Sequence, residues 1–408
     1  MIERGEEERI DLDRIADGLS EVRPYKNKEL KAEEKRKKKN GKVRKSSIAL
    51  LLFSIALFLG VVGYVTVLHG NIPFVVKWRN IWIETAMTTD QHKWLATWFF
   101  PDRLINEIMA DQFDNKNLSI TQTEKKEEVV EEEEKEILDI YGNMSTDILG
   151  QSYLVEGEED PHGNIVYAND VEQGIVIIDV KKSQYRGKLV MIDDPSRVYL
   201  STTNRKGSIG QFICDYLEKE DAVLGINASG FKDPEGHGIG GVVTGQCVSH
   251  GEYWGYYRSK YSLVGFDDED RLVVGGISNW KDYNIRDGMQ YRPTLIIDGE
   301  KQVKGSGGWG VQPRTVVGQA SNGVVFFLVI DGRKVGYSLG ATMGECADLL
   351  LEYGAVTAGA CDGGSSSVLA YNGELINRPS TTMPKGRYLP NAWVVAPKSA
   401  DDEQGDIS

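Results

Sequence analysis

The sequence predicts an α+β fold, with a large mixed but mainly antiparallel sheet, a few packed helices and an N-terminal transmembrane helix. Between residues 137 and 397, many short runs rich in Val and Ile are separated by glycine, and the 408-residue chain contains 45 glycines. This pattern is typical of strands joined by turns. Only residues 208–220 and 342–353 of that region repeat apolar side chains at helical spacing. Many strands and few helices together indicate the α+β class.

The N-terminal part of the chain predicts a membrane anchor. Residues 46–68 carry no charged side chain and reach the length of about 20 residues that crosses a bilayer core. Lys and Arg crowd residues 31–45, directly before this segment. The positive-inside rule therefore places the charged tail, residues 1–45, in the cytoplasm. We expect a single-pass protein of the cell membrane whose globular domain is extracellular.

Four further segments complete the expected organisation. Residues 69–113 are rich in Trp, and we expect helices that lie at the membrane surface or pack on the globular domain. Residues 114–136 are polar and then acidic, which is typical of an extended spacer. The globular domain is expected over residues 137–397, and residues 398–408 form a polar tail.

The strands expected in the globular domain are identified by their Val and Ile content. In chain order they are residues 174–180, 187–192, 222–226, 262–266, 271–274, 294–297, 324–330, 355–361 and 391–395. The second helix should begin with a capping box formed by Thr342 and Glu345 and should end at Gly354. We find no internal repeat and no dinucleotide or phosphate-loop fingerprint, and we expect no cofactor.

Charge and cysteine content exclude other classes. The net charge is −14, and the basic run before the apolar segment reads as a membrane flank rather than a nucleic-acid site. The four cysteines form no CxxC pair, so neither a disulfide scaffold nor a zinc site is expected; they are Cys214, Cys247, Cys346 and Cys361.

Polar residues follow three expected strands, each beside glycine or another small residue: Asn227, Asp331 and Asp362. If these strand ends meet at one edge of a sheet, they form a cleft with an amide and the two carboxylates that glycoside hydrolysis usually needs. The loop after Asp362 offers main-chain N–H groups and hydroxyls to a ligand; it consists of Gly363, Gly364, Ser365 and Ser366. Arg314 and Arg333 are placed to join the cleft, and the guanidinium fork suits a phosphate or carboxylate.

Each of these residues also has a structural interpretation. Asp331 begins an Asp-Gly pair that is common in hairpin turns, and Asp362 could cap its own backbone. Asn227 could form a turn, and Arg314 could be a solvated surface charge. His237 lies between glycines and is a candidate acid–base group, although the sequence indicates no partner for it.

Taken in order, these stretches resemble the phosphodiester glycosidase family. The matching motifs are Ile226-Asn227-Ala228-Ser229-Gly230-Phe231, Gly240-Gly241-Val242-Val243, Arg314-Thr315-Val316-Val317-Gly318, Asp331-Gly332-Arg333, Asp362-Gly363-Gly364-Ser365-Ser366-Ser367, Asn377-Arg378-Pro379-Ser380 and Arg387. The sequence departs from the family pattern at Ala228-Ser229, Gly241, Ser365 and Val368. We expect these departures to change the rim of the site.

The resemblance implies hydrolysis of a sugar-1-phosphodiester between the anomeric carbon and its oxygen. A phosphodiester leaves readily at neutral pH, so catalysis needs charge stabilisation more than protonation. Asp362 or Asp331 would then act as nucleophile or water-activating base. The expected substrate-binding residues are Asn227 for a sugar hydroxyl or acetamido group, Arg314 and Arg333 for the phosphate, the loop of Gly363, Gly364, Ser365 and Ser366 for anion binding through main-chain N–H, and His237 and Arg387.

Location and family chemistry together imply a phosphate-linked envelope glycopolymer or exopolysaccharide as substrate, and no protein partner is indicated. Two alternatives stay open. Gly241 and Ser365 favour a non-catalytic wall- or polysaccharide-binding module. A metal-dependent phosphodiesterase would use Asp331 and Asp362 as ligands, but the clustered His and Asp residues typical of such sites are missing, so no metal is expected.

Overall fold

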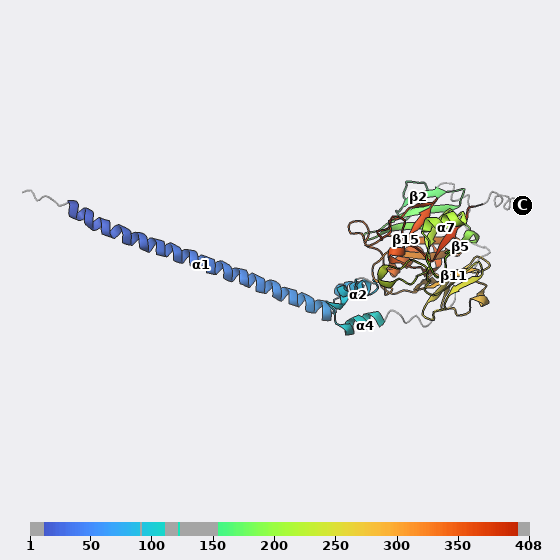
Figure 1. The fold of residues 1–408 in the computed structure, drawn as a ribbon, viewed down its shortest axis with the longest axis horizontal. Coiled ribbons are helices and arrows are strands. Elements are labelled where there is room, and N and C mark those ends of the chain that lie inside the picture. Colours follow the sequence, from blue (N-terminus) through green and yellow to red (C-terminus); the bar gives the residue numbers. More distant parts are fainter. Residues whose placement is uncertain (1–11, 90–91, 111–120, 123–153, 399–408) are drawn as a thin grey trace, which may run out of the picture. The chain divides into compact units, whose positions relative to one another are not determined.

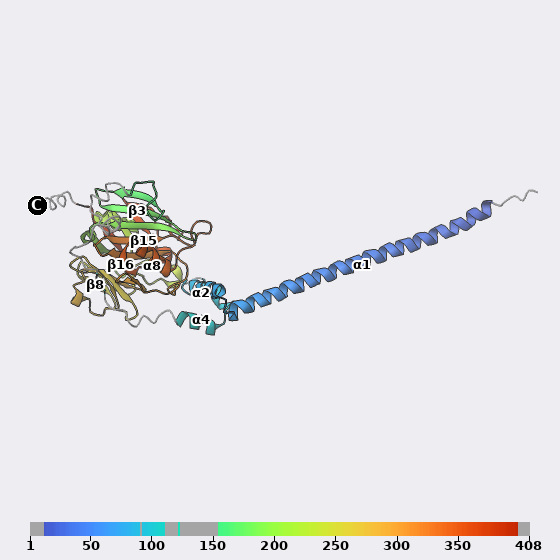
Figure 2. The ribbon, with the colours of Figure 1, turned by 180° about the vertical axis from the view of Figure 1, so that it is seen from behind.

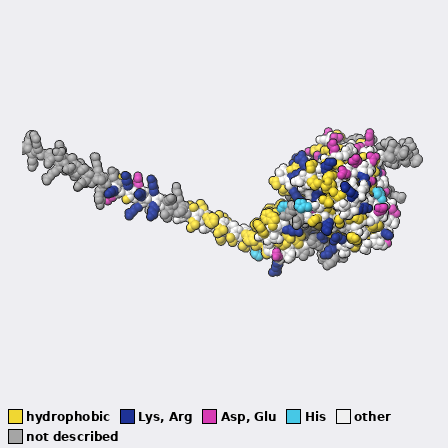
Figure 3. Space-filling model, viewed as in Figure 1, with side chains coloured by type: hydrophobic (Ala, Val, Ile, Leu, Met, Phe, Trp, Pro, Cys, Tyr) yellow, Lys and Arg dark blue, Asp and Glu magenta, His cyan; other side chains and the backbone are white. Residues whose placement is uncertain are grey.

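The computed structural model describes residues 12–89, 92–110, 121–122 and 154–398, and the chain divides into two compact units, residues 1–76 and 77–408. The first unit is dominated by helix α1 (Leu12–His69) (Figure 1). Residues 47–69 of α1 form an apolar stretch of 23 residues, none of it buried. Figure 3 shows hydrophobic side chains along this stretch, with Lys and Arg gathered nearer the N-terminus. This helix is long and apolar enough to cross a membrane.

The Trp-rich segment is helical, as expected. It contains α2 (Pro73–Met87), α3 (Trp94–Thr97) and α4 (Asp102–Ala110). Their contact is a small apolar cluster made by Ile83, Ala86, Ala96, Ile105 and Ile108. The Trp side chains remain largely exposed; they are Trp78, Trp82, Trp94 and Trp98.

The globular part contains three antiparallel sheets in place of the single large sheet expected (Figures 1 and 2). The central sheet has the order β13 (Glu300–Lys301), β12 (Thr294–Ile297), β16 (Ala355–Ala360), β14 (Arg314–Ala320), β15 (Val325–Ile330), β4 (Arg186–Ile192), β3 (Ile175–Lys181), β2 (Ile165–Asp170). Twisted sheets of many strands tend to split into packed layers, which explains the division. The class itself, α+β with mainly antiparallel strands, is confirmed.

Two smaller sheets complete the architecture. One has the order β1 (Thr121–Gln122), β10 (Leu272–Gly275), β9 (Ser262–Phe266), β11 (Asp287–Tyr291), β7 (Gln246–Ser249), β8 (Glu252–Gly255). The other has the order β18 (Glu374–Leu375), β17 (Leu369–Tyr371), β6 (Leu224–Asn227), β19 (Asn391–Val395), β5 (Val198–Thr202). The described chain also has short 3₁₀ turns at Pro195–Arg197, Pro234–Gly236, Trp280–Tyr283 and Gly364–Ser366.

The central sheet is buried on both faces. Along β15, Phe326 and Leu328 belong to one apolar cluster, whereas Phe327 and Val329 belong to another. The first cluster includes side chains of helix α8 (Met343–Glu352), and the second includes side chains of both smaller sheets. Burial on two faces is why the expected strands read as continuous Val and Ile runs rather than as alternating patterns.

The two predicted helices are present. Thr342 caps α8 through the expected box, accepting from the Glu345 N–H (3.1 Å) while the Glu345 carboxylate accepts from the Thr342 N–H (2.8 Å). Helix α7 (Ile213–Glu220) begins five residues later than expected. Gln211, two residues before α7, instead forms an antiparallel β-bridge with Leu389.

Some expected boundaries lie outside the described residues. The proposed domain start at residue 137 and most of the spacer at residues 114–136 fall there, as do residues 399–408. Within the spacer, β1 (Thr121–Gln122) pairs with β10, so this short piece is part of a sheet rather than extended linker.

Candidate active site

Asp362 lies directly after the central strand β16, and its main chain is held firmly. Its N–H donates to the carbonyl of Ala228 (2.8 Å), and its own carbonyl accepts from the Asn227 side-chain amide (2.6 Å). The carboxyl keeps partial access to solvent but is crowded by protein atoms. Burial raises the pKa of Asp362 to about 6, even though hydrogen bonds from Ser366 and Tyr291 favour the ionised form. A carboxyl that titrates near neutral pH suits acid–base or nucleophilic work.

Tyr291 is a site residue that the sequence did not reveal. It ends strand β11, and its hydroxyl donates to Oδ1 of Asp362 (2.9 Å). Burial and the neighbouring Asp362 charge raise the pKa of Tyr291 well above its usual value, so the hydroxyl stays a donor at neutral pH. A Cβ on residue 230 would lie 3.1 Å from the Tyr291 ring and 3.9 Å from Asp362 Oδ1, so Gly230 leaves room at this pair.

Asn227 is fully engaged inside the protein and does not present its amide to a cleft. The side chain is 1% exposed. Its oxygen accepts from the Thr315 hydroxyl (2.8 Å) and the Val368 N–H (3.1 Å), and its nitrogen donates to Asp362. Asn227 therefore holds the start of the loop that follows Asp362, and its amide is not exposed to contact a sugar as expected.

Arg314 is also buried, at the start of β14, rather than solvated at the surface. Its guanidinium donates to the carbonyls of Ala341 (2.9 Å), Trp309 (2.9 Å) and Gly310 (2.7 Å). Burial lowers the pKa of Arg314 to about 10, so it remains a cation at neutral pH. These acceptors are neutral main-chain carbonyls rather than carboxylates. A buried cation that faces neutral acceptors is electrostatically prepared for an anion.

Arg333 meets the same loop from the end of strand β15. It has a left-handed backbone (φ +57°) and donates to the side-chain oxygen of Gln312 (2.8 Å). Its Nη2 lies 3.1 Å from where a Cβ on residue 364 would stand, and Arg314 Nη1 lies 3.9 Å from the same position on residue 363. The two glycines therefore allow both guanidinium groups to approach the loop.

The loop itself has few main-chain donors left. The N–H groups of Asp362, Gly364, Ser366 and Ser367 already donate to protein carbonyls. In the described structure, the N–H groups of Gly363 and Ser365 are the loop donors without a protein acceptor. The anion-binding part of the loop is thus narrower than the sequence suggested.

Asp331 does not join this centre, contrary to expectation. It is 3% exposed, and its carboxylate accepts from the Tyr337 hydroxyl (2.9 Å), the Asn377 amide (3.0 Å) and the Arg378 N–H (2.9 Å). Asn377 in turn donates to the Ser367 carbonyl (3.2 Å). A carboxylate so completely hydrogen-bonded anchors neighbouring loops, and we withdraw its assignment as a catalytic group.

Arg387 connects the loop around His237 with the loop that follows Asp362. Arg387 forms an ion pair with Asp233 (2.5 Å) and donates to the Ser365 hydroxyl (3.3 Å) and the Gly238 carbonyl (2.9 Å). Burial alone would raise the pKa of Asp233, but the Arg387 hydrogen bonds lower it. Arg387 thus ties the loop that carries His237 to Ser365. His237 is exposed, and the described structure gives its imidazole no hydrogen bond to Asp362.

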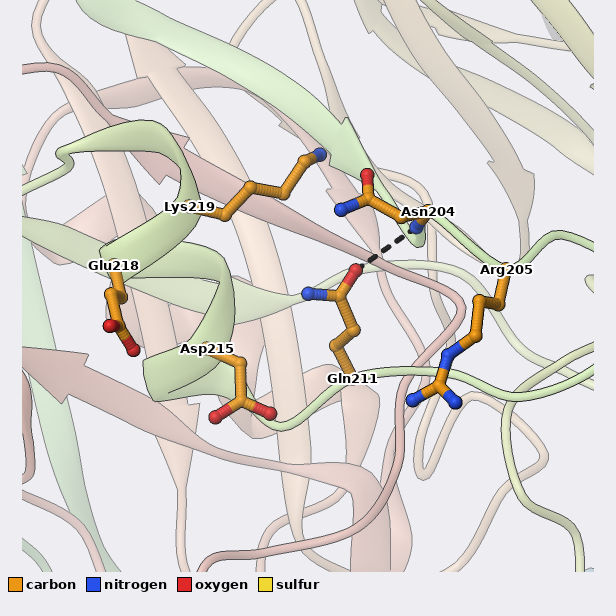
Figure 4. Close-up of a pocket in the computed structure, with 6 residues that line it drawn as sticks. All are labelled: Asn204, Arg205, Gln211, Asp215, Glu218 and Lys219. Atoms are coloured by element: carbon orange, nitrogen blue, oxygen red, sulfur yellow. Dashed lines mark hydrogen bonds between the residues drawn. The ribbon is translucent and has the colours of Figure 1, made fainter.

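An open hollow lies elsewhere, between α7 and the loop before it, with a volume of about 530 Å³. Figure 4 shows the residues that line it, which are Asn204, Arg205, Gln211, Asp215, Glu218 and Lys219. Its lining mixes both charges, and the Gln211 side chain is turned to the Asn204 N–H (3.0 Å). It contains none of the residues that surround Asp362, and we assign it no role.

Among the described residues, no group of three or more His, Cys, Asp or Glu side chains could hold a metal ion. All four cysteines are free, and Cys247, Cys346 and Cys361 are buried. Burial raises the pKa of the Cys346 thiol to about 12, which leaves it unreactive at neutral pH.

Comparison with known proteins bears on this geometry. Residues 220–396 match the model of the phosphodiester glycosidase family. The interval includes Asn227, Tyr291, Arg314, Arg333 and Asp362, so the resemblance seen in the motifs is confirmed for this part of the chain.

A curated protein that is similar to this chain is a distant one. The SPbeta prophage-derived uncharacterized protein YomE of Bacillus subtilis (strain 168) is 29% identical over 200 residues, which are 46% of this chain and 29% of that protein. This chain therefore spans under a third of that relative.

The solved structures to which this chain is similar include the zebrafish N-acetylglucosamine-1-phosphodiester alpha-N-acetylglucosaminidase catalytic domain, auto-inhibited by its pro-peptide. It has a TM-score of 0.45 and 17% identity over 55% of this chain and 82% of that one. A hypothetical protein from Synechocystis has a TM-score of 0.40 and 17% identity over 55% of this chain and 62% of that one.

Proposed function

We propose that this protein is a membrane-anchored hydrolase that cleaves a sugar-1-phosphodiester between the anomeric carbon and its oxygen. The observation that carries the proposal is the position of Asp362. Its carboxyl, with a pKa raised to about 6, adjoins two glycines that two arginine side chains approach. The match to the phosphodiester glycosidase family supports the same reaction class.

The charges of the site residues indicate the role of each group in the reaction. Arg314 and Arg333 stabilise the negative charge of the departing phosphate, together with the N–H groups of Gly363 and Ser365. Because the phosphate leaves as a stable anion, no strong general acid is needed. Asp362, ionised above its pKa, supplies the carboxylate. It either takes the proton of the water that attacks the anomeric carbon, or attacks that carbon itself and forms a glycosyl ester that water then hydrolyses. The products are the free sugar and a phosphate monoester.

The second carboxylate in this site is Asp233 rather than Asp331. The charge of Asp233 raises the pKa of Asp362, and its ion pair with Arg387 keeps it ionised. We propose that Asp233 acts only through its charge, and that Asp362 is the single carboxylate that takes part in the reaction.

Location suggests the substrate class. The apolar stretch of α1 follows a basic segment, and the positive-inside rule would leave the domain outside the cytoplasm. A phosphate-linked envelope glycopolymer or exopolysaccharide fits that location.

Asp362→Asn tests the assignment directly. The full chain, purified in detergent, would be assayed for release of free sugar from a panel of α- and β-linked sugar 1-phosphodiesters, with and without EDTA. We expect wild-type turnover that EDTA does not affect, and a loss of several orders of magnitude in the variant. Near-wild-type turnover by Asp362→Asn would remove the catalytic assignment, and loss of activity in EDTA would favour a metal-dependent phosphodiesterase.

A polysaccharide-binding module without catalysis is a second candidate, favoured by one observation. A Cβ at Gly241, where the family pattern has Asn, would lie 2.2 Å from the Ser208 carbonyl oxygen, so this backbone leaves no room for that side chain. Calorimetric binding of envelope glycopolymer fragments without any hydrolysis would support this candidate over the hydrolase.

A further inference from the structure

Helix α2 reaches the loop that builds the anion-binding side of the site. The Thr85 hydroxyl accepts from the Val311 N–H (3.0 Å), and the Thr88 hydroxyl accepts from the Gln312 amide (2.5 Å). Glu84 hydrogen-bonds the Ser306 hydroxyl and is 6% exposed. More than 220 residues of sequence separate these partners.

The same loop residues hold the two arginines. Gln312 donates to Thr88 with its nitrogen and accepts from Arg333 with its oxygen (2.8 Å). The carbonyls of Trp309 and Gly310 accept from the Arg314 guanidinium. Gln312 is therefore a direct link between the helix and one guanidinium group, and the adjacent carbonyls link the same loop to the other.

The loop packs closely against α2 at Gly310. Gly310 has a left-handed backbone (φ +58°), and a Cβ there would lie 2.1 Å from the Thr85 hydroxyl oxygen and 2.5 Å from the Thr85 main-chain nitrogen. Only glycine lets the loop and the helix approach so closely. Trp309, one residue earlier, stacks on Tyr291 with ring centroids 6.2 Å apart, so the loop also borders the partner of Asp362.

We propose that Glu84, Thr85 and Thr88 are positioning residues for the phosphate-binding arginines. By fixing residues 306–312 they set where Arg314 and Arg333 meet Gly363 and Gly364, so the helix that follows the apolar segment is part of the site. These three residues lie outside the interval that matches the family model, so the family pattern does not include them. The inference rests on the proposed function for the identity of the anion.

Thr88→Val in the full chain is the test, because valine keeps the shape of threonine and removes the hydroxyl that accepts the shorter hydrogen bond of the Gln312 amide (2.5 Å, against 3.3 Å to the Trp309 carbonyl). Thr89→Val is the matched control, since among the described residues the Thr89 hydroxyl donates only to main-chain carbonyls of α2, those of Thr85 (3.3 Å) and Ala86 (2.9 Å). Thr88→Ser restores the hydroxyl. Binding of inorganic phosphate would be measured by calorimetry, beside the thermal unfolding midpoint of each protein.

We expect Thr88→Val to bind phosphate about tenfold more weakly, the effect of one hydrogen bond of about 1.4 kcal/mol. Thr88→Ser and Thr89→Val should bind phosphate like the wild type, and all variants should unfold at similar temperatures. Phosphate affinity unchanged in Thr88→Val, or lowered equally in Thr89→Val, would overturn the inference.

Hydrolysis of sugar 1-phosphodiesters, measured in parallel, tests the positioning role of Thr88 separately from the proposed reaction. Wild-type hydrolysis with no effect of Thr88→Val on phosphate affinity would remove only the positioning role. A selective loss of phosphate affinity without hydrolysis by any protein would keep the positioning role and remove the proposed reaction.

Discussion

The hydroxyl of Tyr291 donates a hydrogen bond of 2.9 Å to Oδ1 of Asp362, and it joins two segments 71 residues apart. Tyr291 comes from one of the smaller sheets and Asp362 from the central sheet. The bond stabilises the ionised carboxyl, whereas burial opposes ionisation. The balance between the two sets the pH at which Asp362 becomes a carboxylate.

Tyr291→Phe should shift that balance. Losing a donor to the charged form should raise the pKa of Asp362 by about one unit, since a hydrogen bond to a charged group contributes roughly 1.5 kcal/mol. The acidic limb of the kcat/KM profile should move upward by the same amount. An acidic limb that stays in place would show that the phenol does not tune Asp362.

Asp362→Asn should affect stability in a pH-dependent way. The folded pKa of Asp362, about 6, lies above the ordinary value of 3.8, so the folded state binds the proton more tightly than the unfolded state. Stability contributed by this group is therefore full below about pH 4 and is lost as pH rises to 6.

Asparagine carries no charge at any pH, so the variant does not lose stability as pH rises through the pKa of Asp362. At pH 7.5 the variant should be more stable than the wild type by about 1–3 kcal/mol, and the difference should vanish near pH 4. Denaturant unfolding at the two pH values measures it. If the stability of the variant minus that of the wild type is smaller at pH 7.5 than at pH 4, the raised pKa is contradicted.

Asn227→Ala should damage the fold and the site together. It leaves the Thr315 hydroxyl, the Val368 N–H and the Asp362 carbonyl without their buried partner, at a cost of about 2–4 kcal/mol. Thr315→Val is the milder comparison and should cost about 1 kcal/mol. If Asn227 instead binds sugar, Asn227→Ala would raise KM and leave the unfolding midpoint unchanged.

The two arginines should respond differently to substitution. Arg333 is exposed, so Arg333→Ala should weaken phosphate binding by about tenfold with little change in unfolding temperature. Arg314→Ala removes the guanidinium hydrogen bonds to the carbonyls of Ala341, Trp309 and Gly310 and should destabilise the fold as well. Calorimetry with phosphate and thermal unfolding of both variants test this, and equal loss of stability in both would contradict the assignment.

Local signals in the sequence predicted much of the fold. The Thr342–Glu345 box marks the start of α8 within one residue, and Val and Ile runs locate strands such as β15 and β19. The division into three sheets was not predictable, because strand runs carry no information on which neighbour they pair with.

The site was predicted in part. The motifs around Arg314, Arg333 and Asp362 do meet at one loop. The direction of a side chain at a strand end is set by tertiary packing, so Asp331 could not be told from Asp362 before their partners were known. Tyr291 and Thr88 contact residues distant in sequence, and no local pattern marks them.

In the proposed reaction, Asp362 and the arginine-lined loop break the bond between the anomeric carbon of the sugar and the phosphate oxygen. Hydrolysis of a sugar 1-phosphodiester in ¹⁸O-labelled water, with mass spectrometry of both products, tests where the bond breaks. We expect ¹⁸O in the released sugar and none in the phosphate monoester, with the signal lost in Asp362→Asn. Label in the phosphate product would contradict it.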